Sequence, residues 1–161
     1  MKKFYTNKTM QLLDSVDFSM IISKLVTQQG WSRQNAEEIC KLYKNYLFLS
    51  AKYPEKKLPP SEDVDEFWHA HILDTQKYHG DCEKIFGYYL HHYPYFGIDG
   101  HSTMADNNNE FSAMQSIYFS EFGEYIYEVR TPFQKLISLG RMIKNKFTSR
   151  KVSNNKTKIG A

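Results

Sequence analysis

The stretch that decides the fold reads SEDVDEFWHAHILD and spans residues 61–74. Ser61 is a residue type that caps the first turn of a helix, and the acids that follow it suit the positive N-terminal end of a helix. Trp68 and Ile72 lie four positions apart, which places both on one apolar stripe. The stretch therefore predicts an amphipathic helix from about residue 62 to residue 73.

The residues before this stretch predict two more helices. The segment FSMIISKLVTQQ follows Asp17 and ends at Gly30, with its apolar residues at helical spacing. A longer apolar pattern begins after Ser32 and ends before Pro54. The intervening PEKKLPP, residues 54–60, contains three of the chain's five prolines and is expected to be extended and exposed.

The residues after this stretch also read as helical. Asp74 and Thr75 are expected to cap a helix that continues to about residue 92 and stops near Pro94, although one bent helix over 62–92 is the alternative. Residues 95–109 have the composition of a loop, and helical patterns return at 110–126 and 132–147. No strand-like alternation occurs, so we predict a single all-α domain of five to seven helices over 1–131, followed by a basic, partly disordered tail over 132–161.

The histidines of the central stretch indicate a metal site. Positions i and i+2 of a helix point about 200° apart, so His69 and His71 cannot both bind one ion from a regular helix. Asp65 and His69 are four positions apart and share a face. If the next helix folds back, it brings either His91 or His92 toward Asp65.

An Asp and two His form a suitable ligand set for zinc or non-haem iron. The candidate metal ligands are Asp65, His69, His71 and His92. The alternative is that these histidines are half-buried structural residues without a ligand. The chain contains no GxGxxG, GxxxxGK[ST], GxSxG or HExxH motif, so a nucleotide-dependent enzyme is disfavoured, and no residue is assigned as catalytic.

Part of the chain resembles a known family. The segments LPPSEDVDEFWHAHILDTQKYHGDC and IFGYYLHHYPYFG, with the later IYFSEFGE, resemble the glycine-rich domain-containing protein-like family over roughly residues 30–127. Its recurrent residues correspond here to Asp65, Trp68, His69, His71, Thr75, Tyr78, Asp81, Cys82 and His92. The resemblance implies that the histidines act together, but it implies no defined activity for the chain. The chain has only eight glycines and no glycine-rich tract.

Charge divides the chain into two parts. Residues 1–131 contain 18 acids against 13 Lys and Arg, a net charge of about −5, whereas residues 132–161 contain eight basic residues and no acid. The pattern PFQKLISLGRMIKNKF predicts a basic amphipathic helix that docks on a partner, lies on an anionic membrane, or closes the core of its own domain. The candidate partner-binding residues are Phe133, Leu136, Arg141, Ile143, Lys144 and Phe147.

These observations favour a small cytoplasmic accessory protein that docks on another protein as part of a larger assembly. The chain has no apolar run long enough for a membrane span and no signal-peptide pattern, and Cys40 and Cys82 match no disulfide framework. A metal-binding protein or metal-dependent enzyme is the alternative function. An anionic membrane surface is the second candidate partner, and nucleic acid is disfavoured because the basic segment is short and has no reading motif.

Overall fold

The computed structural model describes residues 2–95 and 104–126 of the 161-residue chain. The helices are α1 Lys2–Ser15, α2 Ser19–Gln29, α3 Arg33–Lys52, α4 Glu62–Ile72, α5 Thr75–Phe86 and α6 Met104–Phe122. The described part contains no strand, which confirms the all-α prediction and the expected number of helices. All six helices belong to one compact unit, Met1–Ile126.

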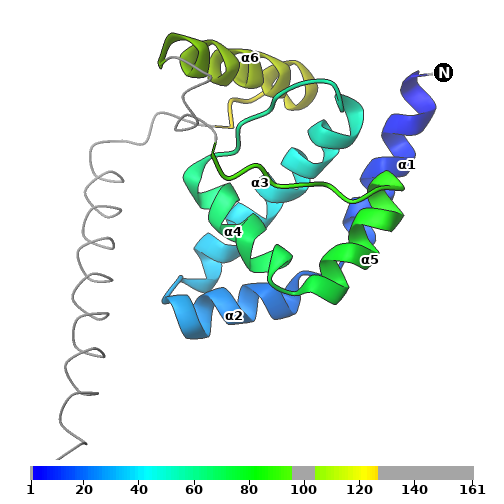
Figure 1. The fold of residues 1–161 in the computed structure, drawn as a ribbon. Helices are drawn as coiled ribbons and strands as arrows, with labels where there is room; N and C mark the ends of the chain where they lie inside the picture. Colours follow the sequence, from blue (N-terminus) through cyan, green and yellow to red (C-terminus); the bar gives the residue numbers. More distant parts are fainter. Residues whose placement is uncertain (1, 96–103, 127–161) are drawn as a thin grey trace, which may run out of the picture. The chain divides into compact units, whose positions relative to one another are not determined.

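Helix α3 is the element around which the other helices pack (Figure 1). Ser32 caps it by accepting a hydrogen bond from the backbone N–H of Asn35, and the helix ends just before Pro54, as the sequence predicts. Helices α1, α2 and α4 all contact α3, and α4 also contacts α2 and α5. This arrangement places the histidine-bearing helix α4 against the centre of the domain.

The core between α2, α3 and α4 consists of packed rings. Phe18, Tyr43, Phe67 and His71 meet mainly edge to face, with ring centroids 5.0–5.9 Å apart. All four side chains are buried. Aromatic residues make up 16% of the sequence, and those at the centre of the domain build a core that includes one histidine.

Several predicted boundaries are wrong. Helix α1 was not predicted, and its apolar pattern is weak because polar residues interrupt it in KKFYTNKTMQLLDS. Helix α5 ends at Phe86, not near residue 92, because Gly87 adopts a left-handed conformation (φ 73°) that closes the helix. A single bent helix over 62–92 is also wrong, since α4 and α5 are separate. Helix α6 begins at Met104, inside the expected loop.

Helix α6 is attached to α3 by polar contacts as well as by rings. Lys52 forms an ion pair with Glu121, and the Tyr53 hydroxyl donates to the same carboxylate at 2.5 Å. Asn45 donates to the Tyr118 hydroxyl at 2.7 Å. These bonds hold the C-terminal end of α3 in place, where the linker to α4 begins.

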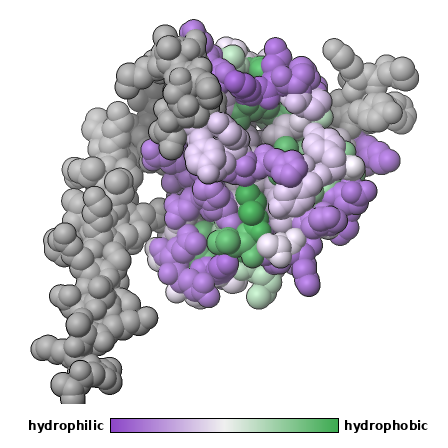
Figure 2. Space-filling view, viewed as in Figure 1, coloured by the Kyte–Doolittle hydropathy of each residue, from purple (hydrophilic) through white to green (hydrophobic). Residues whose placement is uncertain are grey.

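The face of the domain shown in Figure 2 is mostly hydrophilic, with apolar side chains gathered in a few small areas. None of the helices in the described part combines the length and the apolar content needed to cross a bilayer. The predicted boundary at residues 131/132 and the predicted basic helix with its six partner-binding residues lie outside the described residues.

Candidate metal centre

Helix α4 supplies two of the three residues of the candidate site. The Ser61 hydroxyl accepts a hydrogen bond from the Val64 N–H at 3.2 Å, and this cap fixes the first turn of the helix. Val64, Phe67 and Trp68 are buried and determine how the helix is rotated about its axis. Asp65 and His69 consequently project together from the more exposed side of α4.

The third residue, His92, comes from the segment that follows α5. Gly87 ends that helix, and the chain continues without regular structure through residues 88–93. The Tyr78 hydroxyl donates to the Leu90 carbonyl at 2.5 Å, and the Trp68 indole N–H donates to the Tyr78 hydroxyl at 2.9 Å. The His92 ring also packs on Trp68, with centroids 4.6 Å apart. These contacts tie the segment back to α4.

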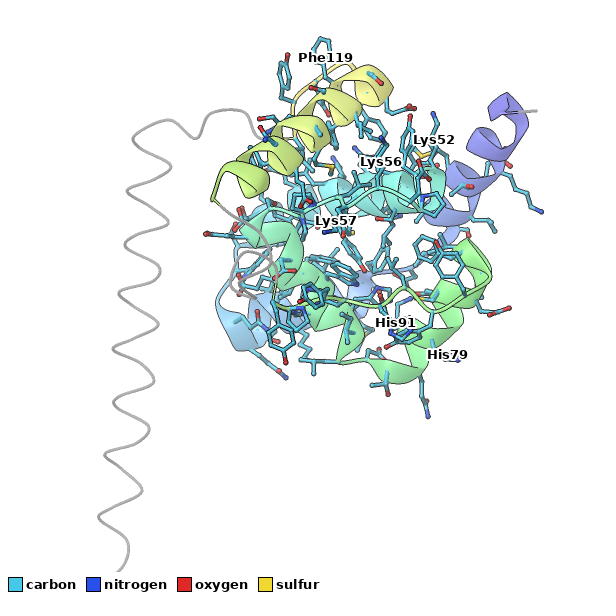
Figure 3. The ribbon with its side chains drawn as sticks, turned by 45° about the horizontal axis from the view of Figure 1, so that its top comes forward. Lys52, Lys56, Lys57, His79, His91 and Phe119 are labelled. Carbon is cyan, nitrogen blue, oxygen red and sulfur yellow. The ribbon has the colours of Figure 1, made fainter. Side chains whose placement is uncertain are left out.

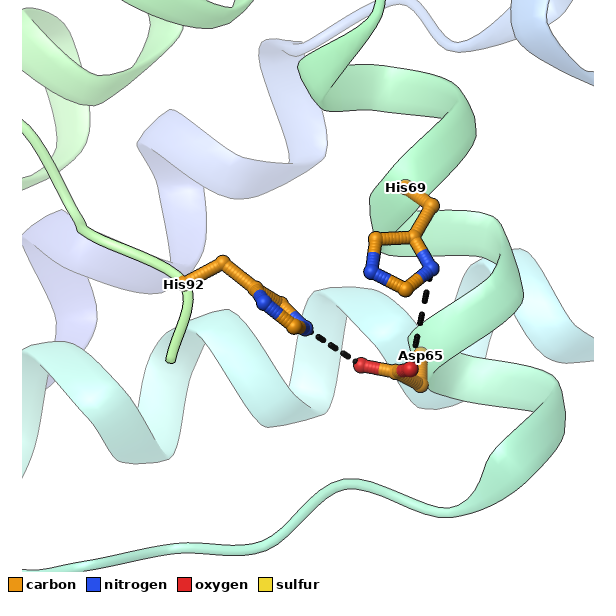
Figure 4. Close-up of side chains that lie close together, drawn as sticks. All are labelled: Asp65, His69 and His92. Carbon is orange, nitrogen blue, oxygen red and sulfur yellow. Dashed lines mark hydrogen bonds and ion pairs between the residues drawn. The ribbon is translucent and has the colours of Figure 1, made fainter. Parts of the chain in front are cut away.

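Asp65, His69 and His92 form a compact cluster (Figure 4). The distance from His92 Nε2 to Asp65 Oδ1 is 2.7 Å, and the distance from His69 Nδ1 to Asp65 Oδ2 is 3.6 Å. Candidate ligand atoms from all three residues lie within 4.8 Å of one another. The side chain of His69 is 50% exposed, that of Asp65 is 32% exposed and that of His92 is 13% exposed, so the cluster is accessible from one side.

The chemistry of the cluster suits a transition-metal ion. Bonds of about 2.0–2.1 Å in a tetrahedral zinc site place the ligand atoms roughly 3.3 Å apart, so the 2.7 Å contact between His92 and Asp65 would lengthen while the longer distances in the cluster shorten. The half-exposed His69 side chain has the freedom to make that movement. His92 Nε2 now faces the Asp65 carboxylate as a hydrogen-bond donor, and ion binding requires its proton to leave or to reside on Nδ1. Three protein ligands leave a coordination position open.

His71 does not join this cluster. Its side chain is 1% exposed and lies in the core, where the Tyr43 hydroxyl is 2.9 Å from Nδ1 and an Asp81 carboxylate oxygen is 3.1 Å from Nε2. Lys77 binds the same carboxylate oxygen at 2.7 Å. Burial lowers the pKa of His71 to about 4, although the Asp81 charge opposes the shift. Neutral His71 thus donates from Nε2 to Asp81 and accepts at Nδ1 from Tyr43.

The remaining histidines near the site face elsewhere. Of the two adjacent candidates, His92 approaches Asp65, whereas His91 is exposed and lines a separate pocket. His79 is exposed on α5. Cys82 is buried with a free thiol, and burial raises its pKa, so it acts as a small apolar residue. The structure places Asp65, His69 and His92 together, and metal binding by them remains a prediction.

Sequence reasoning missed the residues that position His92. Trp68 was placed on an apolar stripe, but the hydrogen bonds that run from Trp68 through Tyr78 to the Leu90 carbonyl were not predicted. The only sequence signal for them is Gly87, which ends α5 early enough for residues 88–93 to return to α4.

Comparison with known proteins corrects the family assignment. A family model described as UCP032817-like matches residues 8–118, which include all three residues of the cluster and exclude the basic segment after residue 131. The resemblance to the glycine-rich domain-containing protein-like family is therefore wrong. The WHAH and HH histidines did not identify the family, and the chain has no glycine-rich tract. No curated protein and no solved structure matches the chain.

Proposed function

Because the chain belongs to the UCP032817-like family, whose description names no activity, we propose a function from the chain's own residues: it binds a divalent zinc or iron ion through Asp65, His69 and His92. The observation that supports this proposal is the convergence of one carboxylate and two imidazoles from α4 and the segment after α5. Two imidazoles and one carboxylate are a ligand set of both zinc sites and mononuclear non-haem iron sites.

The surroundings of the cluster also support a binding site. His92 packs on the buried ring of Trp68, and the hydrogen bond from Tyr78 to the Leu90 carbonyl holds the segment that carries His92. An isolated ion pair on a protein surface would not require these contacts. Such outer contacts orient ligating histidines in metal sites. With three protein ligands, the ion would keep an open position for water or another small molecule.

The metal proposal predicts about one equivalent of zinc or iron in protein purified without a histidine tag and without chelators, as measured by elemental analysis. In competition titrations, Asp65→Asn, His69→Ala and His92→Ala should each weaken zinc binding. Loss of a residue that only hydrogen-bonds to a metal ligand reduces metal affinity about 10–100-fold, so loss of a ligand itself should reduce it at least about a hundredfold. Binding should also weaken in acid, because protons compete with the ion for the imidazole nitrogens.

The exposed His79 provides a matched control, since His79→Ala removes one imidazole outside the cluster. That variant should bind zinc like the unchanged protein, and circular dichroism should show that all variants remain folded. The proposal would be wrong if the purified protein contained no stoichiometric metal and if the three ligand variants bound zinc as well as the control did. Asp65, His69 and His92 would then form a structural cluster.

A second proposal concerns the basic segment at residues 132–161. Its support is a contrast in charge: the segment contains eight basic residues and no acid, whereas residues 1–131 carry a net charge of about −5. We propose that this segment docks on another protein. Truncation after Arg130 should change the melting temperature by only a few degrees and abolish pull-down of the partner. Aggregation or a much lower melting temperature would instead place the segment in the core. Loss of binding to anionic vesicles, steeply dependent on salt, would assign it to a membrane surface.

A further inference from the structure

A pocket lies beside the candidate metal centre but does not include it. Its walls come from α3, from the proline-rich linker between α3 and α4, from Trp68 on α4 and from the segment after α5. Its volume is about 620 Å³, within the range of small-molecule sites, which is roughly 300–1,000 Å³. Asp65, His69 and His92 are not among its lining residues.

The segment after α5 separates the pocket from the cluster. Leu90, His91 and Tyr93 line the pocket, whereas His92 binds Asp65. His92 therefore leaves the side on which its two neighbours, His91 and Tyr93, line the pocket. The pocket and the cluster therefore lie on the two sides of one segment.

The body of the pocket is aromatic. Tyr46 and Trp68 form part of the wall, with ring centroids 5.2 Å apart, and both are buried. Tyr88 and Tyr93 also line the pocket and are 45% and 55% exposed, which leaves aromatic surface accessible to a ligand. Three prolines of the linker, Pro54, Pro59 and Pro60, complete that side. Such surfaces accept flat or branched apolar groups.

The charge in the pocket is positive. Lys56 and Lys57 line it from the linker, and His91 lines it from the segment after α5, whereas no Asp or Glu is among the lining residues (Figure 3). Lys57 approaches Glu110 at 3.8 Å, but its side chain is 78% exposed, so this pair is weak. Lys56 makes no ion pair within the described part of the chain. The two ammonium groups can thus accept an anionic group.

From these observations we propose that the pocket binds a small amphipathic organic anion, with its aromatic or branched apolar body against Tyr46, Trp68 and Tyr88 and its carboxylate or sulfonate near Lys56 and Lys57. The ligand class follows from aromatic walls combined with cations and no lining acid. The proposal does not depend on metal binding, because the two sites share no ligating residue.

The test uses two fluorescent probes with the same type of aromatic body. Anilinonaphthalene sulfonate carries an anion, and phenylnaphthylamine is its neutral counterpart. With the full-length chain in the presence of a chelator, the anionic probe should bind saturably at one site and more tightly than the neutral probe. Because charge pairs at exposed sites contribute about 0.2–1 kcal/mol each, the combined Lys56→Gln and Lys57→Gln variant should weaken binding of the anionic probe by about two- to thirtyfold. Binding of the neutral probe should stay nearly unchanged.

Matched controls separate the pocket from the rest of the surface. Tyr88→Ala should weaken both probes, whereas Phe119→Ala removes a ring of similar exposure, 46%, on α6 and should weaken neither. Lys41→Gln removes an exposed lysine that does not line the pocket and should leave both affinities unchanged. Equal affinity for the two probes, unsaturable binding, or equal effects of the pocket and control variants would overturn the proposal.

Discussion

Replacing Trp68 by Ala is expected to lower the free energy of unfolding by about 3–5 kcal/mol, as measured by urea denaturation. Trp68 is only 4% exposed, and its ring packs on Tyr46 and His92 with centroids 5.2 and 4.6 Å away. Truncation therefore removes a large apolar surface and leaves a cavity between α3, α4 and the segment after α5. It also removes the donor that binds the Tyr78 hydroxyl.

A second variant separates packing from hydrogen bonding. Trp68→Phe keeps an aromatic ring but loses the indole N–H, so its effect should be smaller than that of the Ala variant, about 1–2 kcal/mol. Trp31 is also buried and retains a fluorescence signal for unfolding in both variants. A change below about 1 kcal/mol for Trp68→Ala would show that the ring supports little of the core and would contradict its assigned role.

The parts of the fold that could be predicted are those determined by local chemistry. Ser32 and Ser61 cap helices as their side chains and positions indicate, and Pro54 follows the end of α3. The spacing of Asp65 and His69 places them on one face because four residues make about one helical turn. Each of these features depends on residues within a few positions of one another.

The features that could not be predicted depend on distant contacts. The partners of His71 are Tyr43, which is 28 positions earlier in the chain, and Asp81, which is ten positions later. Its burial in the aromatic core, not its spacing from His69, decides that it is structural. The position of His92 likewise depends on the hydrogen bond from the Tyr78 hydroxyl to the Leu90 carbonyl. That bond is possible only because α5 ends before Gly87, which frees the following residues to return to α4.

The buried network around His71 predicts that the domain loses stability in mild acid. Burial lowers the pKa of His71 from 6.5 to about 4 in the folded chain. Between these values the unfolded chain binds a proton that the folded chain does not, so stability falls as the pH decreases. The groups that face this imidazole are Tyr43, Asp81 and Lys77, together with the rings of Phe18 and Tyr78. The Lys77 charge also disfavours protonation of His71.

The expected size of the effect follows from the shift. One proton changes stability by about 1.4 kcal/mol per pH unit, so the free energy of unfolding should drop by about 3 kcal/mol between pH 6.5 and pH 4. The carboxylates of Asp17 and Glu121 have lowered pKa values, so they add to the loss as the pH approaches and passes below their ordinary values of 3.8 and 4.5. A variant of His71 keeps both carboxylates, so comparing its slope with that of the unchanged protein isolates the contribution of His71.

The decisive measurement is the slope of the unfolding free energy against pH, obtained by urea denaturation with a chelator present so that metal binding does not contribute. His71→Gln removes the titrating group, and whatever its absolute stability, it should show a shallower slope between pH 4.5 and 6.5. The exposed His79 supplies the control, since His79→Gln should keep the slope of the unchanged protein. Equal slopes in all three proteins would mean that His71 carries a proton in the folded chain. A charged His71 paired with Asp81 would then replace the neutral His71 described above.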